Sequence, residues 1–342
     1  MNRELNREYP ELDDPNVFEQ MAELTAAQVK AVDGRLRRAQ HAKATGCVTA
    51  QFRIADTVPA GLRHGVFEEP GRLFHAIVRF SNAQGTFEKD SVGTARGLAI
   101  KLLDVTSQRA VPDDGDATQD FLMVDHSVFP FPDPKAYLET ISRKHIPLVG
   151  NVVALAHLAL LEPDELKIIK AIKGKSVASP LEIKYWSGTP FWLGPATGPD
   201  GHAVKYSAVP RQADRRVQPD GGHDLPDDAL TQALDAALRS NEAVFDFKVQ
   251  LQTDPVAMPV EDASVEWDET HSVPVTVATL VIPAQRVDPS GELAARCEPM
   301  SFNPWHSLVE HRPLGGMNRL RKVVYLASVQ KRGGQPASAA VM

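Results

Sequence analysis

Hydrophobic and polar side chains alternate without a break from Val244 to Gln252. Successive side chains of a strand point to opposite faces of a sheet, so this segment predicts an antiparallel strand that is buried on one face only. The buried face carries Phe245, Phe247, Val249 and Leu251. A second, more fully buried strand is predicted over Val273 to Ile282.

Further β-rich segments precede these two strands, separated by glycine, proline and aspartate clusters that mark turns. They are Cys47 to Ile54, His75 to Ser81, Gly97 to Leu103 and Asp120 to Val124. The proline, glycine and aromatic residues from Leu181 to Val209 predict irregular strands. A polar loop is predicted from Pro210 to Pro226.

Helical periodicity marks three other parts of the chain. Leu24 to Arg38 carries apolar side chains at helical spacing. A helical stretch is predicted from about Pro134 to Lys173, with a break near Pro147 and a new start at Pro163, because proline suits the first helical turn. The last predicted helix runs from Leu314 to Lys331.

Many antiparallel strands that are followed and interrupted by helices predict an α+β fold, whose sheet can close into a barrel. We expect a single domain over residues 1–342. Within it, residues 1–23 are expected to form a polar arm and residues 333–342 a flexible tail.

Composition narrows the classes of partner. The 342 residues carry a net charge of -7, with 24% charged and 43% hydrophobic residues, which is typical of a soluble globular protein. No strongly basic block is present, and this argues against nucleic acid, because neutralising phosphates needs clustered lysine and arginine.

The apolar segments and the cysteines indicate where in the cell the protein is expected. The N-terminus has no apolar secretory segment, so the cytoplasm is the expected location. The longest apolar run, Ile146 to Leu161, is too short to span a bilayer and is predicted to be a buried helix. Cys47 and Cys297 lie far apart, without metal-type spacing, and are predicted to be buried thiols.

Two arginines, a tyrosine and a serine recur at helical spacing in the last predicted helix. Arg321, Tyr325, Ser328 and Arg332 stand at i, i+4, i+7 and i+11, which places them along a single stripe. A phenol binds ferric iron well as phenolate, and a free tyrosine has a pKa of about 10, so such a ligand needs a cation nearby. Arg321 lies one turn from Tyr325, and the stripe could hold a haem. The alternative is a core-facing tyrosine beside a solvated basic face.

Four segments, in their order and spacing, resemble the haem domain of the catalase family. They are Arg38-x-x-His41-Ala42-Lys43, Arg79-Phe80-Ser81-Asn82, Ala95-Arg96-Gly97-Leu98-Ala99-Ile100-Lys101 and Arg321-x-x-x-Tyr325, with Ser301-Phe302-Asn303-Pro304 shortly before the last. The resemblance extends from about residue 25 to Arg332. It implies a catalase-like antiparallel β-barrel with flanking helices and a bound haem iron. It also implies that the wrapping and helical regions of full-length catalases are lacking.

The resemblance implies roles for eight residues. His41 matches the distal histidine that shuttles a peroxide proton, and Tyr325 matches the tyrosinate that binds the iron, with Arg321 as its partner. The remaining matches are Arg38, Arg79 and Arg332 to the partners of the haem propionates, Ser81 to a serine beside the distal histidine, and Phe129 to an aromatic residue over the haem. Without the resemblance, His41 would be interpreted as a surface histidine and the arginines as members of surface ion pairs.

Three positions depart from the family pattern. The family's distal asparagine corresponds to Val124 when residues are counted without a gap from Phe129, and to Asp125 after a shift of one residue. Gln40 stands before His41, where the family has valine. Thr94 replaces an acidic residue of the family's substrate channel. We therefore expect haem binding to be retained and the pocket for hydrogen peroxide dismutation to be altered.

The resemblance predicts a haem-dependent peroxidase with weak catalase activity, which reduces hydrogen peroxide or organic hydroperoxides with an organic electron donor. Two alternatives remain open. One is an allene-oxide-synthase-like rearrangement of fatty-acid hydroperoxides, and the other is haem binding without catalysis. We expect no nucleic-acid partner, no membrane span, and a monomer or small homo-oligomer.

Overall fold

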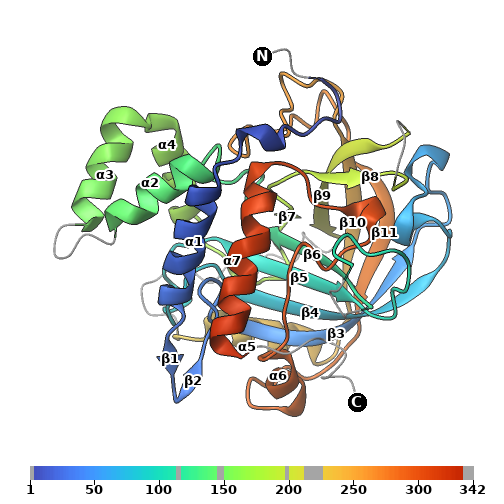
Figure 1. Cartoon of the computed structure of the whole chain (residues 1–342). Coiled ribbons are helices and arrows are strands. Elements are labelled where there is room, and N and C mark those ends of the chain that lie inside the picture. The colour runs from blue at the N-terminus through green and yellow to red at the C-terminus, as the bar shows by residue number, and fades with distance from the viewer. Residues whose placement is uncertain (1–3, 113–116, 145–149, 197–199, 212–225, 334–342) are drawn as a thin grey trace.

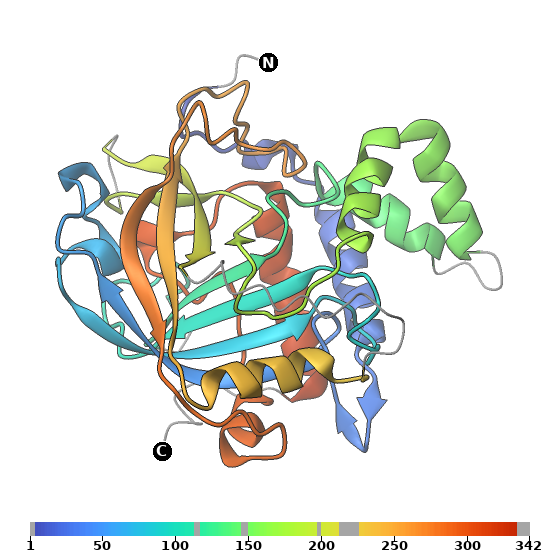
Figure 2. The same cartoon turned by 180° about the vertical axis from the view of Figure 1, so that it is seen from behind.

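The computed structural model describes residues 4–112, 117–144, 150–196, 200–211 and 226–333. Its main feature is an antiparallel sheet in the strand order β10, β11, β3, β4, β5, β6, β7, β9, β8, in which β9 also pairs with β10. This pairing closes eight strands into a barrel, with β8 attached to β9 (Figures 1 and 2). The predicted antiparallel β-barrel is therefore confirmed.

The barrel strands agree with the predicted β-rich segments and with the strand predicted from the alternation of side chains. Their bounds are Ala44–Ile54 (β3), Leu73–Asn82 (β4), Arg96–Leu102 (β5), Gln119–Val124 (β6), Tyr185–Trp186 (β7), Phe191–Leu193 (β8), His202–Pro210 (β9), Ala243–Leu251 (β10) and Val275–Ile282 (β11). In β10, Phe245, Phe247 and Val249 are fully buried in the barrel, as expected from their alternation with polar residues. Most of the predicted polar loop after Pro210 lies outside the described residues.

Aromatic side chains fill the inside of the barrel. Phe52, Phe121 and Phe247 pack against one another, with ring centroids 4.7 to 6.0 Å apart. His311, at the end of a short 3-10 helix (Val309–His311), also enters this core and contacts the ring of Phe67 edge-on at 4.9 Å. Because its interior is packed, the barrel contributes to a binding site mainly through its outer face.

Helices cover the barrel from outside. Their bounds are Pro15–Gln28 (α1), Pro134–Lys144 (α2), Gly150–Leu161 (α3), Pro163–Lys173 (α4), Ala229–Leu238 (α5), Glu292–Cys297 (α6) and Gly316–Arg332 (α7). α1 and α7 pack against each other and lie across the outer face of strands β4 to β6 (Figure 1). α5 and α6 contact β3 at the lower edge of the barrel.

Two predictions near the N-terminus are wrong. Helix α1 begins at Pro15, inside the expected polar arm, where the Asp14 side chain accepts a hydrogen bond from the Asn16 amide at 2.9 Å. It ends at Gln28, ten residues before the predicted end. The next residues form a small hairpin of Ala31–Val32 (β1) and Arg35–Leu36 (β2). The sequence Asp33-Gly34 makes this turn, because both residues adopt positive φ angles of 52° and 74°.

Helices α2, α3 and α4 form a lobe beside the barrel and confirm the predicted helical stretch (Figures 1 and 2). The predicted break near Pro147 lies outside the described residues. The expectation that the apolar run is a buried helix is wrong for α3. Val152, Leu155, Leu160 and Leu161 are 69%, 55%, 80% and 66% exposed, because α3 lies on the side of the lobe away from the barrel.

The two cysteines are buried as predicted, but they are not separate thiols. Cys47 in β3 and Cys297 at the end of α6 are paired as a disulfide, with Cα atoms 6.5 Å apart. The pairing holds α6 against the barrel. No helix of the described residues is long and apolar enough to cross a membrane.

Candidate functional site

A cavity of about 440 Å³ lies between the outer face of strands β4 to β6 and helices α1, α2, α4 and α7. Eight residues that the sequence comparison singled out line this cavity. They are Arg38, His41, Arg79, Ser81, Phe129, Arg321, Tyr325 and Arg332. They come from four separate parts of the chain, so the fold brings the whole predicted set to one place.

Tyr325 projects from α7, and Arg321 lies one turn before it. The Nη2 atom of Arg321 donates a hydrogen bond to the phenol oxygen of Tyr325 at 3.3 Å. Its Nη1 atom donates to Thr189 Oγ1 at 3.2 Å and to Asn318 Oδ1 at 3.1 Å. Asn318 is buried and is itself held by the carbonyl oxygens of Pro190 and Leu314. The guanidinium is thus fixed against the phenol, so its charge acts on that oxygen.

Thr189 and Asn318 were not found from the sequence. Asn318 precedes Arg321 by three residues, a spacing that places both on one side of a helix, and this was the available signal. Thr189 lies in a loop far away in the chain, and nothing in its local sequence points to α7.

His41 is held on the opposite side of the cavity by strands β4 and β5. Its Nδ1 atom lies 2.9 Å from Ser81 Oγ, the partner that the resemblance implied. The imidazole lies directly on Gly97, where an added Cβ would come within 2.6 Å of Nδ1. Only glycine leaves room for the ring at this position of β5.

The backbone of His41 adopts a left-handed conformation with a φ of 55°, which is unfavourable for a residue with a side chain. Three contacts hold it there. The His41 amide donates to the Ala83 carbonyl at 3.0 Å, the Ala42 amide donates to the Gln84 carbonyl at 3.0 Å, and Arg79 Nη2 donates to the His41 carbonyl at 2.8 Å. Arg79 therefore helps to place the histidine, in addition to its own exposure to the cavity.

Burial, with smaller effects of the guanidiniums of Arg79, Arg321 and Arg38, lowers the pKa of His41 from 6.5 to about 3. The imidazole is therefore neutral at physiological pH. In the tautomer whose Nδ1–H donates to Ser81 Oγ, Nε2 is unprotonated and can accept a proton from a ligand.

The arginines gather at one end of the cavity. Met300 accepts hydrogen bonds through its carbonyl oxygen from Arg38 Nη2 at 2.8 Å and from Arg332 Nη2 at 3.1 Å. Glu298 pairs with Arg38 at 3.3 Å. Burial, followed by the neighbouring arginines, lowers the pKa of Arg79 well below its usual range.

This cluster holds more positive than negative charge. The Nε atoms of Arg79 and Arg332 are buried and have no hydrogen-bond partner among the described residues. A buried donor without an acceptor is costly, so the cluster favours an anionic ligand with several oxygens.

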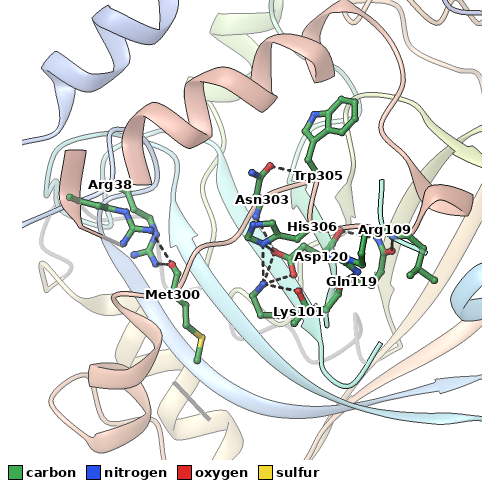
Figure 3. A network of polar contacts seen from close by, with 12 residues as sticks. Arg38, Lys101, Arg109, Gln119, Asp120, Met300, Asn303, Trp305 and His306 are labelled. Carbon is green, nitrogen blue, oxygen red and sulfur yellow. Dashed lines mark hydrogen bonds and ion pairs between the residues drawn. The ribbon is translucent and has the colours of Figure 1, made fainter. Parts of the chain in front are cut away.

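A buried ion pair anchors the chain segment that carries Met300 (Figure 3). Lys101 in β5 and Asp120 in β6 are directly opposite each other, and Lys101 Nζ lies 2.7 Å from Asp120 Oδ1. The other carboxylate oxygen accepts a hydrogen bond from the backbone N–H of Asn303 at 2.9 Å. It also lies 3.2 Å from His306 Nδ1. Burial alone would raise the pKa of Asp120, but Lys101 and His306 lower it. This pair could not be recognised from the sequence, because the charges face each other only once β5 and β6 are paired.

The three residues that differ from the family pattern also line the cavity. Val124, Gln40 and Thr94 belong to its wall. Asp125 does not, because its carboxylate accepts a hydrogen bond from the Arg96 amide at 2.9 Å and lies 3.8 Å from Lys175 Nζ. The structure therefore favours the count without a gap, with Val124 toward the cavity. His126 is the next polar residue in the wall.

The rest of the wall is mainly apolar and includes Phe129, Phe302, Leu320 and Val324. Tyr137 is a second tyrosine in this wall, and its ring meets that of Phe129 edge-on at 5.3 Å. Burial, with a smaller effect of Tyr325, raises the pKa of Tyr137 to about 12, so it is a poor candidate for a phenolate ligand.

These residues fit a haem. A haem needs an apolar slot for the macrocycle, an axial ligand and cationic partners for two carboxylates. The cavity offers apolar walls, the phenol of Tyr325 next to Arg321, and a cluster of arginines with unpaired donors. Its volume lies within the usual range of small-molecule sites.

No family model matches the chain. A catalase-related peroxidase of Mycolicibacterium paratuberculosis is 26% identical over 307 residues, which cover 87% of this chain and 89% of that protein.

Solved catalases share the fold over nearly the whole chain. A fungal catalase superimposes with a TM-score of 0.69 at 18% sequence identity and covers 98% of this chain. Catalase A of Saccharomyces cerevisiae superimposes with a TM-score of 0.70 at 17% sequence identity and also covers 98% of this chain. A bacterial catalase gives 0.67 at 17% over 95%. The chain spans only 66%, 68% and 62% of these three proteins, respectively. The chain therefore has the fold of the catalases and is similar in sequence to a catalase-related peroxidase.

Proposed function

We propose that this protein is a haem-dependent peroxidase, which reduces hydrogen peroxide or an organic hydroperoxide at the expense of an organic electron donor. The observation that carries the proposal is the convergence of His41, Tyr325 and the arginine cluster on one cavity. The name of the mycobacterial relative, a catalase-related peroxidase, supports the same reaction class.

Each side chain has a definite task in this proposal. Tyr325, supported by Arg321, would hold the haem iron, and Arg38, Arg79 and Arg332 would bind the propionates. The bound haem would supply the redox chemistry of peroxide reduction. His41, neutral and held by Ser81, accepts the proton of one peroxide oxygen and delivers it to the other, which assists cleavage of the bond between them.

Donor oxidation should outweigh dismutation, because the pocket lacks an amide where dismutation needs a second peroxide to be oriented. Val124 occupies that part of the wall, and Asp125 is held elsewhere by Arg96 and Lys175. One missing hydrogen bond to the peroxide corresponds to roughly 1 kcal/mol or more of lost stabilisation. Thr94 also brings no negative charge to the cavity wall.

The test measures oxygen release and oxidation of a phenolic donor on the same haem-loaded sample. Donor oxidation should dominate in the native protein. Val124→Asn, which restores an amide, should shift the ratio toward oxygen release by about tenfold. Oxygen release that dominates in the native protein at all peroxide concentrations would contradict the proposal.

The two alternatives give different outcomes in the same assay. A rearrangement enzyme would convert a fatty-acid hydroperoxide without consuming donor, and a storage or sensing protein would do neither. Gln40, which stands where the family has valine, donates a hydrogen bond to Gln28 of α1 at 3.0 Å and so lies at the edge of the cavity. Gln40→Val is therefore the variant that tests whether this residue directs the peroxide toward rearrangement.

A further inference from the structure

Helix α3 exposes apolar side chains in a way that nothing else in the described chain does. Five large apolar residues, Val152, Val153, Leu155, Leu160 and Leu161, are at least 36% exposed within this one helix. Other exposed apolar residues, such as Val256 and Val273, are scattered singly along the chain, which is ordinary for a soluble protein.

The composition of α3 is that of a helix covered on most sides. Between Gly150 and Leu161, Asn151 and His157 are the only residues that are neither apolar nor glycine. Such a helix normally lies in a protein core or in lipid. Here the contacts with α2 and α4 bury only Ala154 and Leu158.

The helices beside α3 carry positive charge. Exposed lysines lie at the end of α2, at Lys144, and along α4, at Lys167, Lys170 and Lys173. The lobe as a whole has six lysine and arginine residues against four aspartate and glutamate residues, in a chain with a net charge of -7. Burial and nearby carboxylates raise the pKa of Glu165 to about 7, which reduces the negative charge of the lobe further.

We propose that the lobe of α2, α3 and α4 docks on the surface of an anionic lipid bilayer, with α3 entering the interface and the lysines of α2 and α4 binding the headgroups. Apolar area and attraction between lysines and anionic lipids are the two contributions that hold such helices at a membrane. The described helices do not span a bilayer, so the binding is peripheral.

A second copy of the chain fits this surface less well. A symmetric dimer through α3 would bring two positively charged lobes together, and like charges across an interface oppose association. An anionic membrane can bury the apolar side chains of α3 and attract the lysines at the same time.

The same lobe forms part of the cavity wall. Ile141 and Lys144 of α2, and Ile169, Ile172 and Lys173 of α4, line the cavity. Because Lys144 and Lys173 are also exposed, the cavity reaches the surface at this lobe. Docking would place this opening beside the bilayer, where an apolar reactant has a short route in; that consequence rests on the proposed function, whereas docking itself does not.

The experiment is co-sedimentation with vesicles, which needs no enzymatic activity. The native protein should bind vesicles of phosphatidylcholine with phosphatidylglycerol, bind vesicles of phosphatidylcholine alone far more weakly, and lose binding as salt rises. Leu155→Gln with Leu160→Gln should weaken binding about tenfold per leucine. Lys167→Gln with Lys170→Gln should weaken it about fivefold per lysine.

Val256→Gln with Val273→Gln is the matched control, since it removes two exposed apolar residues outside the lobe. This control should bind vesicles like the native protein. Circular dichroism and thermal melting verify that each variant is folded. The proposal is overturned by a native protein that stays in the supernatant, by a control that loses binding equally, or by sedimentation velocity showing a dimer that only the leucine substitutions dissolve.

Discussion

At the scale of single residues, the chemistry of the site depends on a few side chains whose neighbours fix their protonation and position. His41 is neutral because it is buried among guanidiniums, and it is oriented by Ser81 and Gly97. Sequence comparison could identify His41 and Ser81 through their motifs. It could not show that the imidazole packs directly against Gly97, because that contact depends on the pairing of β4 with β5.

Replacing His41 with alanine should leave haem binding intact and slow peroxide reduction by about 10²- to 10⁴-fold, because general acid-base assistance is lost. The measurements are haem affinity by absorbance titration and the rate of donor oxidation. Ser81→Ala, which keeps the imidazole but removes its hydrogen-bond partner, should slow peroxide reduction much less. An alanine variant that turns over at the native rate would exclude His41 from the reaction.

His311 predicts how acid affects stability. Val66 donates its amide proton to Nε2 at 2.9 Å, so Nε2 is unprotonated and Nδ1 carries the proton shared with Tyr206. Burial, then His64, lowers the pKa of His311 from 6.5 to about 3. Below pH 6.5, His311 is protonated in the unfolded chain but remains neutral in the folded chain. This residue therefore lowers the free energy of unfolding by about 1.4 kcal/mol per pH unit as the pH drops toward 3.

The check is the free energy of unfolding by denaturant across that pH range. His311→Gln should show a shallower loss toward low pH than the native protein, whatever its stability at neutral pH. His271→Gln, at an exposed position, is the control for removing a histidine. An unchanged slope in His311→Gln would mean that the buried imidazole is protonated in the fold.

At the scale of elements, α7 and the strands β4 to β6 form the two sides of the site. The β-rich segments between turn residues predicted these strands well, and the helical stripe predicted that Arg321, Tyr325 and Arg332 act together. The helix predicted from Leu24 to Arg38 was wrong because apolar spacing extended across Asp33-Gly34, whose positive φ angles make a hairpin instead. The exposure of α3 was also missed, because an apolar run does not reveal whether other elements cover it.

Strand β5 offers a direct test of this packing. In Gly97→Ala the new methyl group would approach His41 Nδ1 to 2.6 Å and Ser81 Oγ to 2.8 Å, so the imidazole must move. Donor oxidation should fall by about tenfold to a hundredfold, because a displaced catalytic group loses its alignment. Gly61→Ala, with no atom within 4 Å of the added Cβ, is the control. Equal activity in both variants would show that the ring does not depend on Gly97.

At the scale of the whole molecule, a closed barrel with a packed interior presents its outer face to helices from both ends of the chain. α1 and α7 meet there, and the loop before α7 is tied to the barrel by Lys101 and Asp120. This long-range assembly explains why the fold class could be predicted from local patterns while the contacts of Thr189 and Asp120 could not. The disulfide between Cys47 and Cys297 adds a further tie.

Reduction of that disulfide should lower the free energy of unfolding by about 2 to 4 kcal/mol, since it links residues 250 positions apart. It should also weaken haem binding, because the Cys297 carbonyl accepts a hydrogen bond from Arg38 at 3.2 Å. Denaturation with and without reductant measures the first effect. Cys47→Ser should not respond to reductant, and a native protein that also fails to respond would mean that the bridge is not formed. Disulfides are rare in a reducing cytoplasm, so the same assay bears on the expected location.

Above all, we infer that Tyr325 would hold a haem in this cavity. The most direct measurement is an absorbance titration of haem into the native protein, Tyr325→Phe and Tyr137→Phe, since both tyrosines line the cavity. The native protein and Tyr137→Phe should give the same spectrum of tyrosinate-bound ferric haem, and Tyr325→Phe should lose it. A Tyr325→Phe spectrum identical to that of the native protein would mean that Tyr325 is not the iron ligand.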